Sequence, residues 1–258
     1  MRAISAAQAA ALDTELMSSS IGFDLSTLVE LAGQSVSTAI TQFYPVNTHR
    51  RVIVACGPGN NGSDGLVTAR YLAALGYAVN VVVPALPSAS RSNTPSAICH
   101  SRALAQLALW NVGVFSTFPK AMENSIEKYS HDTDLPVIVD AVFGFSFVGT
   151  PRHPFDTLLT ELAIASNKYP VVSIDTPSGW PVDAGLGWRP NEGLSIIPKL
   201  LVSLTAPKFC AAAHKGPHFL GLACAIVPPQ LCQRYGIDYT HIDTIYPATG
   251  SSLLRRLA

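Results

Sequence analysis

Charged side chains are scarce in this chain. Lys, Arg, Asp and Glu together make up 13% of its 258 residues, which is about half the share in an ordinary soluble domain. Lys and Arg number 17, and Asp and Glu also number 17, so the formal net charge is zero. Without a basic excess or a basic tract, the composition argues against nucleic-acid binding as the main role.

Paired cysteines and long apolar runs are also missing. The five cysteines are odd in number and none forms a C-x-x-C pair, which argues against a zinc site and favours free thiols in a reducing compartment. No apolar run reaches the roughly 18 residues of a membrane helix, and residues 1–20 lack the apolar block of a signal peptide. We therefore expect a cytoplasmic protein that binds no membrane, with a mitochondrial form as the alternative.

What the chain does contain is a regular alternation of two patterns. Apolar runs typical of buried parallel strands alternate with stretches of helical character, with Ser5 and Asp24 as N-caps of the first two helices. This alternation predicts an α/β fold with a mostly parallel sheet, in one domain over 1–237. Periodicity fades over 238–258, where we expect a partly disordered tail. The expected strands are 51–56, 78–83, 112–116, 137–142, 171–175, 200–204 and 222–227, and the expected helices are 5–18, 24–43, 63–75, a segment ending near 110, 119–129 and 155–166.

The first of three unusual strand-end loops reads GPGNNGSDG. Gly57, Gly59 and Gly62 match G-x-G-x-x-G between a strand and a helix, a context in which backbone amides face a phosphate. The acidic residue that would bind a ribose hydroxyl about 20 positions later is missing, which weakens a dehydrogenase interpretation. The neighbouring asparagines and Asp64 could also hold a cation, and a tight turn without a ligand stays an alternative.

The other two loops begin with carboxylates at strand ends. Asp140 and Asp175 each close an apolar strand, and ligands of open parallel sheets bind beyond such ends. Two strand-end carboxylates in one sheet are candidates for acid–base chemistry or cation binding. Each could instead be a structural anchor of its loop. Lys208 is a weaker candidate, and Trp180 either shields the pocket or simply packs.

Four motifs in order resemble the NAD(P)HX epimerase family, also described as the YjeF N-terminal domain or apolipoprotein A-I-binding protein. They are VACGPGNNGSDGLVTARYL (54–72), VDAVFGFSF (139–147), VSIDTPSGW (172–180) and SLTAPK (203–208), and the resemblance spans roughly residues 3–235. It implies a three-layer α/β/α Rossmann-like fold and an enzyme that interconverts the R and S forms of hydrated NADH and NADPH (NADHX and NADPHX) at C6. It also implies one K⁺ per subunit, a homodimer, and a separate ATP- or ADP-dependent NAD(P)HX dehydratase as functional partner.

The same resemblance assigns roles to residues. We favour Asp175 as the catalytic acid–base residue, because it ends a strand and the resemblance makes it a substrate contact. Ser63 stands where the family usually has glycine, so a different backbone angle is expected there. The implied K⁺ ligands are Asn61, Asp140 and Ser178. The implied substrate contacts are Asn60, Asn61, Gly62, Ser63, Asp64, Gly144, Phe145, Ser146, Phe147, Val148, Gly149, Thr150 and Asp175.

Two rival functions remain at this stage. A dehydrogenase would need the missing ribose-binding acid. A binding or scaffold domain could lose the loop carboxylates, yet Asp64, Asp140 and Asp175 are all present.

Overall fold

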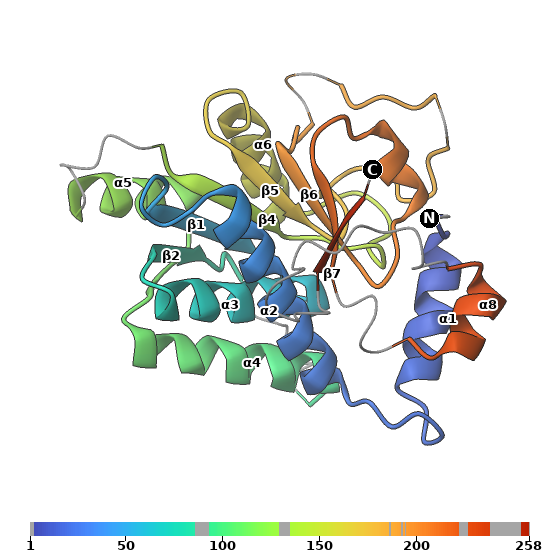
Figure 1. Cartoon of the computed structure of the whole chain (residues 1–258). Coiled ribbons are helices and arrows are strands. Elements are labelled where there is room, and N and C mark those ends of the chain that lie inside the picture. Colours follow the sequence, from blue (N-terminus) through green and yellow to red (C-terminus); the bar gives the residue numbers. More distant parts are fainter. Residues whose placement is uncertain are drawn as a thin grey trace.

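The computed structural model describes residues 3–85, 93–128, 135–185, 187–191, 193, 195–221, 227–237 and 254–257. In this part of the chain, helices cover both faces of one central sheet, which makes three layers (Figure 1). The predicted α/β/α class with a mostly parallel sheet is confirmed.

The sheet has the order β3-β2-β1-β4-β5-β6-β7-β8. All neighbouring strands pair in parallel except β7 and β8, which are antiparallel. The order reverses between β1 and β4, the two strands at which the chain switches from one half of the sheet to the other. The strands are β1 (Arg51–Cys56), β2 (Ala78–Val82), β3 (Gly113–Phe115), β4 (Val137–Ala141), β5 (Val171–Ile174), β6 (Leu200–Leu204), β7 (His218–Gly221) and β8 (Leu254–Leu257).

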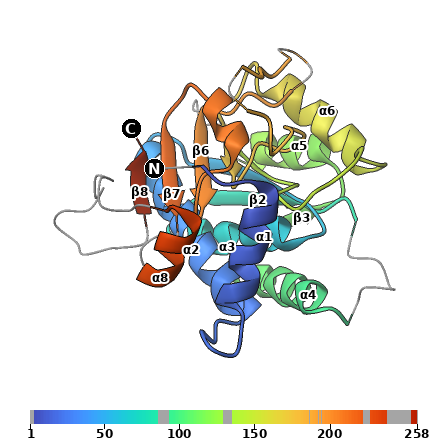
Figure 2. The same cartoon turned by 90° about the vertical axis from the view of Figure 1, so that its right-hand side faces the viewer.

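The helices divide between the two faces, with α2, α3 and α4 on one side and α5 and α6 on the other (Figure 1). A further pair, α1 and α8, lies side by side at the edge of the molecule in both views (Figures 1 and 2). The longer helices are α1 (Ala6–Leu16), α2 (Leu25–Phe43), α3 (Asn60–Ala74), α4 (Pro95–Leu107), α5 (Phe118–Lys128), α6 (Phe155–Ala165) and α8 (Pro229–Tyr235), and two short 3₁₀ turns span Ala108–Trp110 and Phe209–Ala213.

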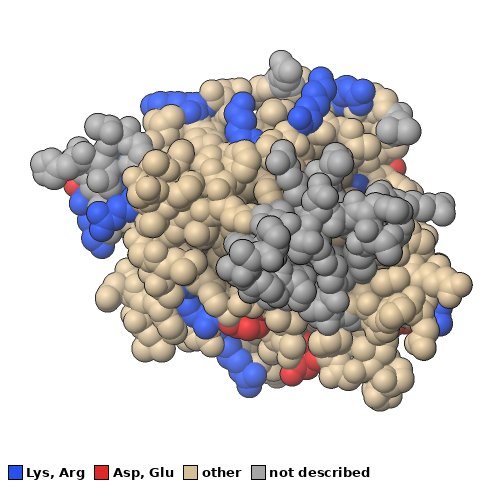
Figure 3. All heavy atoms as spheres, in the orientation of Figure 1, with Lys and Arg blue, Asp and Glu red and all other residues tan. Residues whose placement is uncertain are grey.

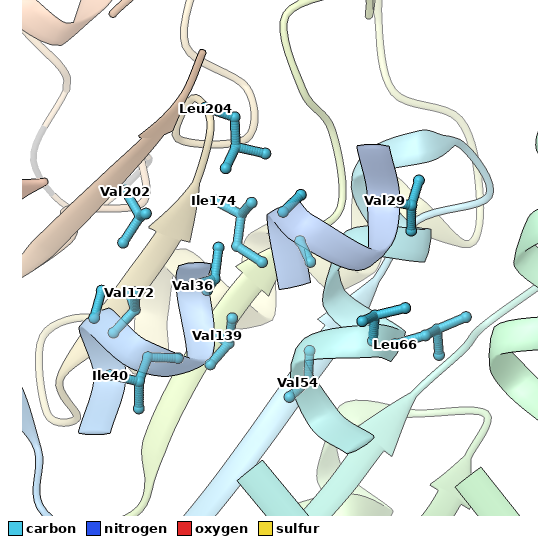
Figure 4. Close-up of a cluster of buried hydrophobic side chains, with 14 of the residues drawn as sticks. Val29, Val36, Ile40, Val54, Leu66, Val139, Val172, Ile174, Val202 and Leu204 are labelled. Carbon is cyan, nitrogen blue, oxygen red and sulfur yellow. The ribbon is translucent and has the colours of Figure 1, made fainter. Parts of the chain in front are cut away.

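Burial on both faces explains why the strands read as unbroken apolar runs. In β1, Val52 and Val54 belong to the cluster under α2 and α3, whereas Ile53 belongs to the cluster under α5 and α6. Figure 4 shows the first of these clusters, with Val36 and Ile40 of α2 near the β4 and β5 valines. Every β1 residue is therefore covered, as expected of a central parallel strand.

The chain starts its helices where the sequence predicted caps. Ser5 accepts a hydrogen bond from the Gln8 amide at 3.1 Å, and Gln8 returns one to the Ser5 amide at 3.0 Å, which completes a capping box. Asp24 accepts from the Thr27 amide at 2.6 Å and caps α2. Both predicted caps are confirmed.

Some elements differ from the sequence predictions. Helix α3 begins at Asn60 and not at Ser63, because Gly59 already takes the extended N-cap conformation. The last parallel strand is β7, directly before the predicted 222–227, of which residues 222–226 lie outside the described residues. Neither α8 nor β8 was predicted from the sequence, and residues 238–253 of the predicted tail are also outside the described part.

The structure agrees with two features of the composition, the low content of charged residues and the lack of long apolar runs. Lys, Arg, Asp and Glu side chains are scattered among uncharged ones on the face drawn in Figure 3. Within the described residues, no helix combines the length and apolar character needed to cross a membrane.

Candidate active site

A cavity of about 710 Å³ opens at the carboxyl ends of the strands, beside the β1–β4 switch point. Ligands of doubly wound sheets bind at this point, and the volume lies within the range of small-molecule sites. One wall is apolar and comes from α1 and α2, with Leu12, Leu16, Leu28 and Val29 among its members. The other wall is polar and comes from the strand-end loops and the first turn of α3.

The first turn of α3 is packed tightly under this cavity. A Cβ on Gly62 would lie 1.8 Å from the Gly57 carbonyl oxygen, and one on Gly57 would lie 1.8 Å from the Val142 carbonyl oxygen. Glycine is therefore required at both positions, which explains two of the three motif glycines. Ser63 is fully buried and helical, with no positive φ, so the helix accommodates serine there.

Asp175 lies at the end of β5 with its carboxylate held on both sides. Oδ1 pairs with the Lys208 ammonium, and Oδ2 accepts a hydrogen bond from the Phe145 amide at 3.1 Å. Both Asp175 and Lys208 are almost completely buried. Lys208 also donates to the Leu204 carbonyl at 2.9 Å and lies 5.0 Å from the Phe145 ring centroid. Lys208, the weaker candidate in the sequence, is thus part of the site.

The backbone at the ends of β5 and β6 is unusual. Asp175 has φ +66° and Thr205 has φ +63°, and in each case the following amide bonds back to the preceding carbonyl, as in a γ-turn. Non-glycine residues rarely adopt positive φ, and such strain gathers at functional sites. Both residues line the cavity. The two turns direct the Asp175 side chain and the segment leading to Lys208 toward the cavity.

Asp140 is fully buried behind the cavity and is surrounded by hydroxyl and amide donors. Its Oδ2 accepts from the Ser173 hydroxyl at 2.8 Å and the Ser178 amide at 2.9 Å, and its Oδ1 accepts from the Ser178 hydroxyl at 2.5 Å. Burial raises the pKa of Asp140, and these hydrogen bonds oppose that rise. In the described residues no ammonium or guanidinium group pairs with this carboxylate.

The residues implied as K⁺ ligands lie around one short segment, 142–144. Asp140 accepts weakly from the Val142 amide at 3.4 Å, the Ser178 hydroxyl accepts from the Phe143 amide at 2.8 Å, and the Asn61 Cβ lies 3.3 Å from where a Cβ on Gly144 would stand. Both polar atoms of the buried Asn61 amide lack a hydrogen-bond partner in the described structure. An orphaned amide near a buried carboxylate fits a hard cation with oxygen ligands.

Two further carboxyl groups, Asp64 of α3 and Asp13 of α1, line the cavity. Burial raises the pKa of Asp64 well above its ordinary value, and the charges of Asp175 and Asp13 raise it further. Burial also raises the pKa of Asp13 to about 6, with Lys208 lowering it and Asp175 raising it. Four ionisable side chains, Asp13, Asp64, Asp175 and Lys208, thus converge on one cavity from four segments of the chain.

Sequence reasoning missed Asp13. A signal was present, because Asp13 lies between Leu12 and Leu16 on the face of α1 that also buries Ala9. A single carboxyl next to the apolar stripe of a short helix is unusual unless it has a function or a partner.

The remaining predicted residues divide into two groups. Within the 144–150 loop, Val148 is 90% exposed and, like Gly149 and Thr150, does not line the cavity. Gly62 and Ser63 support the first turn of α3 from beneath, and Trp180 packs away from the cavity with its indole N–H bonded to the Ile196 carbonyl at 3.0 Å. The cavity-lining members are Asn60, Asn61, Asp64, Gly144, Phe145, Ser146, Phe147 and Asp175.

The fold and the site together define a Rossmann-like protein with a polar, carboxylate-rich pocket at its switch point. A family model described as YjeF-related protein N-terminus matches residues 25–210. The chain belongs to this family.

Comparisons with individual proteins also cover almost the whole chain. The chain is 40% identical over 245 residues to an NAD(P)H-hydrate epimerase of Sclerotinia sclerotiorum, covering 94% of this chain and 93% of that protein. It is 41% identical over 250 residues to pyridoxine/pyridoxamine 5'-phosphate oxidase 1, chloroplastic, of Arabidopsis thaliana, covering 94% of this chain but only 42% of that protein. The crystal structure of the yeast protein YNL200c superposes with a TM-score of 0.80 at 33% identity and covers 100% of both chains.

Proposed function

We propose that this chain is an NAD(P)HX epimerase, which interconverts the R and S forms of hydrated NADH and NADPH at C6. The observation that carries the proposal is the buried Asp175–Lys208 ion pair, which lines a cavity at the switch point of a Rossmann-like sheet. Relatives named NAD(P)H-hydrate epimerase that align with almost the whole chain support the same activity.

The substrate is a dinucleotide, and the cavity offers complementary groups. The first turn of α3 presents free backbone N–H groups at Asn60 and Asn61, which suit a phosphate. The apolar wall of α1 and α2 suits a ring system. Phe145 and the stacked pair Phe143–Phe147, with ring centroids 3.8 Å apart, stiffen the loop between the two walls.

The chemistry is a reversible loss and return of water. The substrate carries a hydroxyl at C6 beside the ring nitrogen N1, whose lone pair can expel the hydroxyl and leave a planar iminium. The leaving hydroxyl needs a proton and the incoming water must lose one. Asp175 takes part in this acid–base chemistry, and Lys208 holds its carboxylate in position.

Asn61, Asp140 and Ser178 would hold the K⁺ ion. When bound, the ion supplies a fixed positive charge that offsets the buried Asp140 carboxylate. Because Ser178 contacts both Asp140 and the Phe143 backbone, ordering these residues also orders the loop that donates to Asp175.

An epimerase only equilibrates two forms of a damaged cofactor. Removal of the added water requires a second activity that consumes one epimer, and this chemistry supports a separate dehydratase as the functional partner.

The test replaces Asp175 with asparagine. Loss of a general acid–base group should lower turnover by about 10²- to 10⁴-fold, while NADHX binding measured by calorimetry stays within a few-fold of wild type. Asp156→Asn is the matched control, since its carboxylate is exposed on α6 and outside the cavity. Near-normal turnover with only weaker binding would remove Asp175 from its role.

A further inference from the structure

Asp13 has no structural task that accounts for its position. Its carboxylate makes no hydrogen bond or ion pair with any residue in the described structure, although it lies beside Leu12 and Leu16 in the apolar wall. Placing an unpaired carboxyl group in an apolar wall destabilises a protein. A carboxyl kept there without a partner is therefore a candidate for contact with a ligand.

Helix α1 holds this side chain in a defined place. At its start, the Ile4 amide donates to the Pro207 carbonyl at 2.8 Å, and Asp183 accepts from the Ala6 amide at 2.7 Å. At its end, Glu15 pairs with Arg234 and accepts a hydrogen bond from the Tyr235 hydroxyl at 2.7 Å. Anchors at both ends fix the helix between the Lys208 segment and α8.

Asp13 and Asp175 approach the cavity from different walls. Asp13 projects from the α1–α2 wall, and Asp175 projects from the strand-end wall. The two groups are close enough that the pKa of Asp13 responds to the charges of Asp175 and Lys208. The unpartnered Asn61 amide lines the same cavity, in the polar wall that also holds Asp175.

Epimerisation at C6 requires access to both faces of a flat ring. Water leaves from one face of the iminium and returns to the other. Asp175 is fixed by Lys208 and the Phe145 amide, so a single carboxylate in that position serves one face only.

We infer that Asp13 is a second catalytic carboxyl group, which serves the face of the nicotinamide-derived ring opposite to Asp175. This inference rests on the proposed epimerase function. A group that titrates near neutral pH suits both halves of such a reaction, and the raised pKa of Asp13, about 6, agrees with this requirement.

The proton and electron pairs balance in each direction. Protonated Asp13 gives its proton to the C6 hydroxyl, the C6–O bond breaks with its electron pair on oxygen, and the N1 lone pair forms the C6=N1 bond. One water leaves. A second water adds to the other face, N1 recovers its lone pair, and Asp175 takes the released proton. The reverse reaction returns the proton from Asp175 to the leaving hydroxyl and regenerates protonated Asp13.

The experiment measures inversion and oxygen exchange together. Each pure epimer of NADHX is incubated in ¹⁸O-labelled water with wild type, Asp13→Asn or Asp175→Asn, and chromatography with mass spectrometry follows both products. Wild type should exchange oxygen as it inverts. Asp13→Asn should lose about 10²-fold or more of inversion, yet still exchange the oxygen of the epimer whose hydroxyl faces Asp175. Asp175→Asn should exchange only the opposite epimer.

The outcomes separate this inference from the proposed function. If Asp13→Asn inverts at the wild-type rate, or if it loses inversion and the exchange of both epimers equally, the second-carboxyl inference is wrong. Dinucleotide binding and melting temperature, measured on the same samples, identify a folding defect. Failure of wild-type protein to accelerate inversion of either epimer would instead refute the epimerase proposal itself.

Discussion

Removing the Asp13 charge should make the protein more stable in a pH-dependent way. Burial raises the pKa of Asp13 from its ordinary 3.8 to about 6. A carboxyl group with a raised pKa binds more protons in the folded protein than in the unfolded chain, so its contribution to stability falls as pH rises between those two values. Above both values, the shift corresponds to a cost of about 3 kcal/mol for the ionised group.

The asparagine variant carries no charge at any pH and avoids this cost. Relative to wild type, its free energy of unfolding should therefore gain about 1 kcal/mol between pH 5 and pH 8. For a chain of 258 residues this corresponds to a rise in melting temperature of about 2 to 4 °C. The ionisable groups that face Asp13 are Asp64, Asp175 and Lys208. The pKa of about 6 already includes repulsion by Asp175, which raises it, and attraction by Lys208, which lowers it.

Urea unfolding followed by circular dichroism at pH 5, 6, 7 and 8 measures this difference. The Glu123→Gln variant on α5, whose exposed carboxylate makes no ion pair in the described structure, should show a stability curve parallel to wild type. A parallel curve for Asp13→Asn as well would show that burial does not raise the pKa of Asp13. The Asp13 carboxyl group would then not lie in the buried position described above.

Two further predictions concern the loop and the ion. Gly62→Ala should destabilise the protein by about 1–3 kcal/mol in urea unfolding, because the added methyl group would clash with the Gly57 carbonyl. Gly59→Ala is the control and should destabilise the protein much less, because the space around Gly59 is open. Equal losses of stability in the two variants would contradict the tight packing of Gly62. K⁺ at ten times its dissociation constant should stabilise wild type by about 1.4 kcal/mol relative to tetramethylammonium at equal ionic strength. Asp140→Asn should lose this difference in thermal melts, and an unchanged difference would move the ion elsewhere.

The alternation of strands and helices was predictable because the buried apolar residues of each element recur at the spacing typical of that element. The strands β1 to β6 and the helices α1 to α6 lie within a few residues of their predicted ranges. The start of α3 was missed because Gly59 caps it through backbone conformation alone, without a capping side chain. Helix α8 was missed because its stability depends on tertiary contacts, among them those of Glu15 with Arg234 and Tyr235.

The site residues that could be predicted from the sequence are those at the ends of strands. Asp140 and Asp175 stood out because carboxylates are costly at the ends of apolar strands. Asp13 and the pairing of Lys208 with Asp175 depend on where α1 and the segment after β6 meet in space, which no local pattern records. The substrate, K⁺ and catalytic roles assigned to these residues stay predictions, and Val148, Gly149 and Thr150 lie outside the cavity.

Epimerase activity can be assayed directly on the wild-type protein. Purified protein in potassium buffer is mixed with a single pure epimer of NADHX, and the appearance of the other epimer is followed by chromatography. We expect the protein to form the equilibrium mixture from either epimer much faster than the spontaneous reaction does, and we expect Asp175→Asn to lose this acceleration. Dinucleotide binding without any acceleration would contradict it and would make the chain a binding module.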